Sequence, residues 1–269
     1  MSDNLPSSPR ARMLDARRRE QQAEAVRRRI VIGVSAGLVL ALAGGVALAI
    51  SNAGDGKAKA AAAAPSGTAA PTALVTPANA GGPDGTVIVY GKPDATRTLA
   101  VYEDFRCPIC KRFEAADGQA VQQSADDGSY KIEYHIAAFL DDSLGGKGSI
   151  TALAAAGAAL NQSVDDFKKF HDVLYANQPA ETQDGFGDVN RILDLAGQVP
   201  GLKTEAFTAA VKNGTYLPWA AKVADAFNSS GVTGTPTLKL DGKQLNLFDA
   251  SGTPLTPDQF TALVKGGAR

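Results

Sequence analysis

The chain has 269 residues, 27 of them basic and 28 acidic, and its formal net charge at neutral pH is −1. The charge is unevenly placed. Residues 1–29 hold eight arginines against four acidic residues, whereas 17 basic and 22 acidic residues follow from Thr86 onward. This acidic balance excludes nucleic-acid binding by charge in the C-terminal part, and it confines the positive charge to one end of the chain.

An uncharged run of 21 residues, positions 30–50, comes directly after the basic segment. As a helix it spans roughly 31 Å, about the hydrocarbon core of a bilayer. The arginines at 27–29 place the N-terminus in the cytoplasm and everything after position 50 outside. A cleavable signal peptide is the alternative, but the long basic segment and the length of the run favour an uncleaved anchor. We therefore expect a single-pass protein of the cell membrane with a cytoplasmic tail, residues 1–29, and an extracytoplasmic C-terminal domain.

Residues 51–85 are mostly Ala, Pro, Gly, Ser and Thr. This composition buries too little apolar surface to order itself, so it predicts a flexible linker with a reach on the order of 30 Å. The folded part is expected at residues 86–269, which is long enough for one domain with its own core. Small residues recur every four positions in the apolar run. That spacing is also frequent by chance, so it leaves open whether the anchor dimerises.

Strand and helix patterns open the folded part. Residues 86–91 and 97–105 are rich in β-branched and apolar residues and predict two strands. Residues 109–123 predict a helix interrupted near Gly118. Residues 130–139 are mostly apolar and predict a strand covered on both faces.

From residue 148 to 230 the apolar residues follow helical spacing instead. Ser163 has the side chain expected at a helix N-cap, while Gly197 and Gly214 fit positions just past helix ends. These signals predict an inserted helical subdomain.

Strand patterns return near the C-terminus, at residues 235–240 and 243–248. The Asp241-Gly242 pair between them indicates a hairpin. A last helix is expected from Thr256, with Pro257 in its first turn. The whole order predicts an α/β fold that carries the helical insertion.

Cys107 and Cys110 are the only cysteines of the chain, and they lie where a predicted strand gives way to a helix. The unpaired N–H groups and dipole of the helix N-terminus stabilise a thiolate there, so they lower the thiol pKa and make Cys107 the attacking sulfur. Pro108 suits the first helical turn. Cys110 lies one turn on, where it can form or resolve a disulfide. Basic side chains add positive charge nearby: Arg106, Lys111 and Arg112.

Two other interpretations of the cysteine pair are weaker. A zinc half-site would need further ligands, and only His135 and His171 remain besides carboxylates. A purely structural disulfide would close a very short loop and stabilise little. A redox pair is favoured, because disulfides persist outside the cytoplasmic membrane. We expect neither a metal nor a cofactor.

Two stretches together resemble the DsbA-like branch of the thioredoxin superfamily: VIVYGKPDATRTLAVYEDFRCPICKRFE and, much later, GVTGTPTLKLDGK. The resemblance covers roughly residues 86–268, with the helical insertion where that family carries one. It implies a thioredoxin-like fold and a protein thiol–disulfide oxidoreductase. It also implies a cis peptide bond between Thr235 and Pro236, facing the cysteines and presenting backbone groups to an incoming peptide. A trans proline in an ordinary turn is the alternative.

The sequence departs from that family at two places. Ile109 lies between the cysteines, where strongly oxidising members often have a histidine that holds the thiolate. Val101 occupies the position at which thioredoxins have a buried acid. Glu103 or Asp104 could substitute as a proton relay for Cys110, or both could be solvated at a strand end. The redox potential therefore does not follow from the sequence.

The sequence also predicts where three further side chains lie. His135, in an apolar strand, is expected in the core or at its rim. His171, on an amphipathic helix, is expected to be a surface or packing residue. Trp219 is expected to pack within the helical block.

Together these features predict a membrane-tethered, extracytoplasmic thiol–disulfide oxidoreductase, acting as an oxidase on secreted or cell-envelope proteins with cysteine thiols. The resemblance implies a quinone-linked membrane partner that recycles the pair. A reductase or isomerase, or a tethered binding domain with an idle disulfide, is the alternative.

Overall fold

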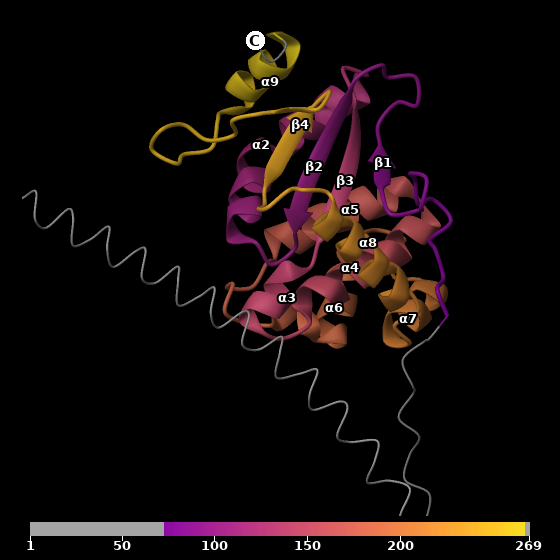
Figure 1. The fold of residues 1–269 in the computed structure, drawn as a ribbon. Helices are drawn as coiled ribbons and strands as arrows, with labels where there is room; N and C mark the ends of the chain where they lie inside the picture. The colour runs from indigo at the N-terminus through magenta and orange to yellow at the C-terminus, as the bar shows by residue number, and fades with distance from the viewer. Residues whose placement is uncertain (1–72, 267–269) are drawn as a thin grey trace, which may run out of the picture. The chain divides into compact units, whose positions relative to one another are not determined.

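The computed structural model describes residues 73–266 (Figure 1). The predicted cytoplasmic tail, the apolar run at 30–50 and residues 51–72 of the predicted linker lie outside the described residues. The linker prediction is wrong for residues 78–85, which hydrogen-bond to the helical part of the fold. Within residues 73–266, no helix combines the length and the apolar character that crossing a membrane requires.

A five-stranded mixed sheet forms the centre of the fold, in the order β1-β3-β2-β4-β5. Strands β2 and β3 are parallel and fully in register from Thr98↔Lys131 to Asp104↔Ala137. The other three pairings are antiparallel. The strand bounds are β1 Ile88–Tyr90, β2 Thr98–Asp104, β3 Lys131–Ala137, β4 Thr237–Leu240 and β5 Lys243–Gln244.

Helices cover the sheet and extend beyond one end of it, while α9 lies toward the opposite end (Figure 1). The helical block contains α3 to α8, so it begins before the predicted start at 148. The helix bounds are α2 Pro108–Asp126, α3 Phe139–Leu144, α4 Gly148–Gln162, α5 Val164–Ala176, α6 Val189–Ala196, α7 Glu205–Lys212, α8 Leu217–Ser229 and α9 Pro257–Gly266, with a short 3-10 turn η1 Gly185–Gly187.

Several local predictions are confirmed. Ser163 caps α5 by accepting a hydrogen bond from the Asp166 backbone N–H. The β4–β5 hairpin turns at Asp241 and Gly242, whose φ angles of 51° and 83° are those of a type I′ turn. Trp219 is fully buried in the helical block, as expected.

Two local predictions are wrong. Helix α2 runs through Gly118 without interruption, and Gly118 is buried. Packing of α2 against α5 and α9 outweighs the roughly 1 kcal/mol that an interior glycine costs. The last predicted strand, 243–248, shortens to Lys243–Gln244, because the following residues leave the ladder and Phe248 instead bridges to Pro254.

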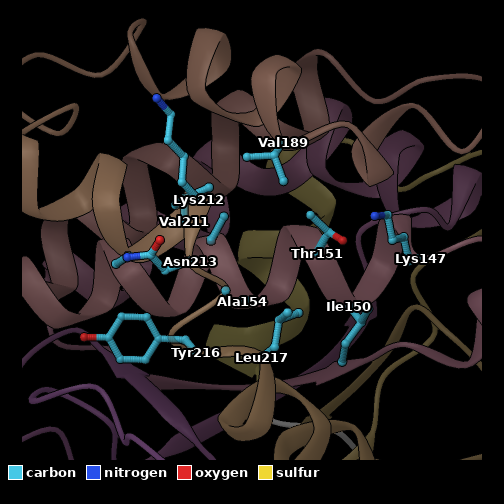
Figure 2. Close-up of a pocket in the computed structure, with 13 residues that line it drawn as sticks. Lys147, Ile150, Thr151, Ala154, Val189, Val211, Lys212, Asn213, Tyr216 and Leu217 are labelled. Carbon is cyan, nitrogen blue, oxygen red and sulfur yellow. The ribbon is translucent and has the colours of Figure 1, made fainter. Parts of the chain in front are cut away.

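A hollow of about 360 Å³ lies within the helical block (Figure 2). Its lining is mostly apolar and comes from α4, α7 and α8, with Lys147 and Lys212 among the lining residues. Neither cysteine lines it, so the hollow is separate from the site described next.

Candidate active site

Cys107 is the N-cap residue of α2, immediately after the turn that follows β2. Its backbone is extended, with φ −71° and ψ 116°, and its Sγ accepts a hydrogen bond from the Cys110 backbone N–H at 3.4 Å. Pro108 occupies the first turn, where its missing N–H leaves no donor unpaired. The predicted position of the thiol at a helix N-terminus is therefore confirmed.

The pKa of the Cys107 thiol is lowered to about 7. The largest cause is a hydrogen bond from the Cys110 thiol, and the backbone N–H groups of Ile109 and Cys110 add to it against the opposing effect of burial. Cys107 is buried, with 6% of the residue exposed, while Ile109 beside it is 38% exposed. The thiolate is thus favoured at a buried sulfur that lies beside an exposed residue.

Cys110 has the opposite character. It is completely buried, and burial, the neighbouring Cys107 sulfur and the Glu103 charge raise its pKa well above the ordinary value. Both cysteines are free thiols in this structure. Cys107 therefore ionises first, and Cys110 keeps its proton.

The Thr235–Pro236 peptide bond is cis, as the resemblance implies, and the trans alternative is wrong. The loop lies against the cysteine pair, because the Cys107 thiol donates to the Thr235 carbonyl oxygen at 3.4 Å. The Thr235 hydroxyl is buried, with no hydrogen-bond partner among the described residues. The pair and the cis-proline loop, 128 residues apart in the chain, thus form one site.

Two of the basic residues near the pair, Arg106 and Lys111, make structural hydrogen bonds. Arg106 is buried, and its guanidinium donates to the Asp141 carboxylate at 2.6 Å and to the Gly145 carbonyl oxygen at 2.9 Å. The Lys111 ammonium donates to the Gln178 carbonyl oxygen. These cations fasten the helical block to the active-site turn, and neither appears among the causes of the lowered pKa of Cys107.

Gln178 is a residue that sequence reasoning missed. Its side-chain amide donates to the Phe105 carbonyl oxygen at 2.8 Å and to the Cys107 carbonyl oxygen at 3.0 Å. The segment just after α5 therefore fixes the backbone on both sides of Arg106. No local pattern indicates this role, because both partners lie more than 70 residues earlier.

Glu103 and Asp104 are both completely buried, so the alternative that they are solvated is wrong. Burial raises the pKa of Asp104 to about 6, although the Ser149 hydroxyl and two backbone N–H groups donate to its carboxylate. One Glu103 oxygen, Oε2, lies 3.0 Å from His171 Nε2. The other, Oε1, has no hydrogen-bond partner within the described part of the chain.

Of the two expectations for His171, the packing one is confirmed and the surface one is wrong, because the imidazole is fully buried against β2. Burial acts to lower its pKa, but hydrogen bonds with Asp172 and Glu103 outweigh burial and raise the pKa to about 9. Glu114, on α2, completes the cluster, and burial together with the Glu103 charge raises its pKa to about 8. His135 lies at the core rim as expected, stacked on Tyr102 at 4.5 Å between ring centroids.

The chain belongs to the thioredoxin family. Residues 84–266 match the family profile described as Thioredoxin, which is most of the chain and includes both cysteines and the cis proline. The sheet and the helix that starts at the cysteine pair fit that assignment.

Similar proteins of known class indicate which kind of thioredoxin-family enzyme this is. Disulfide bond formation protein D of Bacillus subtilis is 27% identical over 161 residues, covering 60% of this chain and 70% of that protein. The oxidised crystal structure of DsbA from Mycobacterium tuberculosis is 27% identical, with a TM-score of 0.54 over 66% of this chain and 87% of that one. Oxidised BdbD from Bacillus subtilis is 25% identical, with a TM-score of 0.55 over 66% and 90%. The enzyme is a DsbA-like thiol–disulfide oxidoreductase.

Proposed function

We propose that Cys107 and Cys110 are the redox pair of this enzyme and that it works as an oxidase, introducing disulfides into secreted or cell-envelope proteins. One observation carries the proposal. The pKa of Cys107 is depressed to about 7 at a helix N-terminus, while Cys110 is completely buried and its pKa is raised well above the ordinary value. A stabilised thiolate favours the reduced pair, which makes the disulfide a better oxidant.

The similarity to disulfide bond formation protein D and to DsbA favours an oxidase over a reductase, whereas a thiol pKa of about 7 also occurs in reducing thioredoxins. A thiol pKa lowered by about two units corresponds to roughly 2.7 kcal/mol, or about 60 mV in a two-electron couple, before any discount for solvent screening. A reductase or an isomerase remains the alternative within the class.

The reaction runs in two exchanges. A substrate thiolate attacks Sγ of Cys107 in the oxidised pair, the Cys107–Cys110 bond breaks, and the leaving Cys110 sulfur takes up a proton. The second substrate thiol then loses its proton and attacks its partner sulfur in the mixed disulfide. The substrate leaves with a new disulfide, and the enzyme keeps two electrons as a Cys107 thiolate and a Cys110 thiol.

The Thr235–Pro236 loop supports substrate binding in this scheme. Its backbone lies beside Cys107 and lacks a donor at Pro236, so an extended peptide segment can lie along it while its cysteine reaches Sγ.

We also propose the location and the recycling partner. The basic segment and the uncharged run at 30–50 support a membrane anchor with the enzyme domain outside. Repeated turnover needs an oxidant for the reduced pair, and a membrane redox partner of the quinone-linked class fits that position.

Trapping tests the role of the pair. In a Cys110→Ser variant the mixed disulfide cannot be resolved from the enzyme side, so we expect dithiothreitol-sensitive adducts between Cys107 and secreted proteins on non-reducing gels. The matched control is the double Cys107→Ser/Cys110→Ser variant, which should trap none. A binding domain with an idle disulfide would give no adducts in either variant.

The direction of exchange is tested by equilibrating the pair with glutathione. An oxidase should have a potential above roughly −180 mV, and a value below roughly −230 mV would make the enzyme a reductase.

A further inference from the structure

A compact cluster of ligand-type side chains lies behind the cysteine pair. Glu103 comes from β2, Glu114 from α2 and His171 from α5, and each offers one ligand atom within 4.8 Å of the others. In a tetrahedral zinc site the ligand atoms lie roughly 3.4 Å apart, given bonds of about 2.1 Å. The three side chains therefore need only small shifts to share one ion.

The Glu103 carboxylate supplies an independent reason to expect a ligand. It is completely buried, and its Oε1 atom has no hydrogen-bond partner among the described residues. A buried carboxylate oxygen without a partner is costly, and the contact with His171 engages only Oε2. A bound cation would coordinate the Oε1 atom that His171 leaves without a partner.

The second nitrogen of His171 has the partner that metal-binding histidines usually have. Its Nδ1 lies 3.3 Å from the Asp172 carboxylate, while Nε2 points to Glu103. Metal-ligating histidines commonly donate their other ring N–H to a carboxylate, which fixes the ring and its tautomer. Asp172 is therefore placed to orient the imidazole.

One member of the cluster, Glu114, borders a groove, while Glu103 and His171 are fully buried and do not line it. The groove, of about 390 Å³, lies between α2 and α5 and is lined by Glu114, Asp172 and Tyr175, among others. An ion can enter there, and a water molecule from the groove can fill a fourth coordination position.

We propose that Glu103, Glu114 and His171 form a binding site for a divalent transition-metal ion of the Zn²⁺ class, with Asp172 as the residue that orients His171. Two carboxylate oxygens and one imidazole nitrogen suit Zn²⁺ or Mn²⁺ better than Ca²⁺. The Glu103 and Glu114 carboxylates together balance the two positive charges of the ion, and the His171 imidazole is then neutral. The ion takes the place of the proton between His171 Nε2 and Glu103 Oε2. The site joins β2, α2 and α5 one helical turn from Cys110.

The test is a calorimetric titration of ZnCl₂ into the full chain, solubilised in a mild detergent, with Cys107→Ser/Cys110→Ser as background. That background removes the thiols, which bind zinc themselves. We expect one ion per chain with proton release, because the ligands must be deprotonated. Adding Glu114→Gln should weaken binding at least tenfold, and adding Asp172→Asn about tenfold.

Matched controls separate this site from incidental binding. Glu205→Gln, an acidic residue in the first turn of α7, should leave the zinc affinity unchanged. His135→Asn, at the only other histidine, should also leave it unchanged. Absence of stoichiometric binding, or equal affinity in the Glu114→Gln and Glu205→Gln variants, would overturn the proposal. Disulfide exchange is not measured here, so either result is independent of the proposed oxidase.

Discussion

At the scale of single residues, Cys107 and Cys110 have thiol pKa values shifted in opposite directions, although they lie within one turn of the same helix. Cys107 precedes the first turn of α2 and faces backbone N–H groups, whereas Cys110 is turned into the core near the Glu103 carboxylate. Donors lower a thiol pKa, and burial beside negative charge raises it. The division of labour between attacking and resolving sulfur follows from position alone.

The Cys107 pKa is directly measurable. In the reduced enzyme, the rate of Cys107 alkylation by iodoacetamide should rise with pH through a midpoint near 7, because only the thiolate reacts. In Cys110→Ser the hydrogen-bonding thiol is replaced, so the midpoint should move. A midpoint near 9 in the unaltered enzyme, the ordinary value of the thiol, would contradict the account.

Arg106 gives a prediction about stability. Arg106→Met removes a buried guanidinium and leaves the Asp141 carboxylate without its cation, which should cost on the order of 3–5 kcal/mol in urea unfolding. The control is Arg112→Met. Arg112 is exposed and donates to the Gly252 carbonyl oxygen, so its loss should cost less than about 1 kcal/mol. An equal loss of unfolding free energy in the two variants would show that the buried Arg106–Asp141 pair contributes no more than an exposed arginine.

At the scale of elements, two interior glycines behave differently because of their neighbours. A Cβ at Gly157 on α4 would lie 2.7 Å from the Trp219 ring of α8, a rigid and buried group. A Cβ at Gly118 on α2 would lie 2.6 Å from Glu114 Oε2, the tip of a flexible side chain. In α4 the added methyl group would therefore clash with the rigid Trp219 ring, whereas in α2 it would displace only the flexible Glu114 side chain.

Replacing each glycine by alanine tests this contrast. Gly157→Ala should destabilise the protein by about 1–3 kcal/mol, since the α4–α8 contact must open. Gly118→Ala should be close to neutral, because its helix-propensity gain of up to about 1 kcal/mol offsets the displacement of Glu114. Thermal unfolding of both variants measures the difference. A more damaging Gly118→Ala would refute this explanation.

Much of each element could be predicted from the sequence, because its signals are local. The strands, the Ser163 cap, the Asp241-Gly242 turn and the helix start at Cys107 each depend on a few adjacent residues. The continuity of α2 through Gly118 did not follow, because packing against other helices decides it.

The parts of the site that sequence reasoning missed depend on distant contacts. His171 lies on an amphipathic helix that looks like a surface element, yet its imidazole meets Glu103, 68 residues earlier. Gln178 reaches the active-site turn over a similar separation. Only the fold brings these side chains to the cysteines, so no periodicity or motif could assign them.

At the scale of the whole molecule, the cysteine pKa values link redox state to stability. The pKa of Cys107 is lower in the folded than in the unfolded enzyme. The Cys107 thiolate therefore adds to the free energy of unfolding above the unfolded pKa near 9, and this stabilisation is lost as pH falls through 7. Cys110 has a raised folded pKa, so its contribution declines as pH rises beyond 9.

Urea unfolding of the reduced enzyme should therefore show stability rising by on the order of 1–2 kcal/mol between pH 7 and 9, relative to Cys107→Ser, after a discount for partial exposure. It should then fall at higher pH. The oxidised enzyme, which has no thiols to ionise, should lack this rise. A parallel rise in both redox states would exclude the cysteines as its source.

The attachment of the first described residues to the rest of the fold has a mechanical consequence. Ala78 and Asn79 bind the C-terminal end of α4, and the carbonyl oxygens of Asp84 and Gly85 bind Lys222 and Trp219 of α8. Tension arriving along the chain from its N-terminal side would load these helices before it reached β1. Such tension would therefore act first on the helical block and only then on β1 and the sheet.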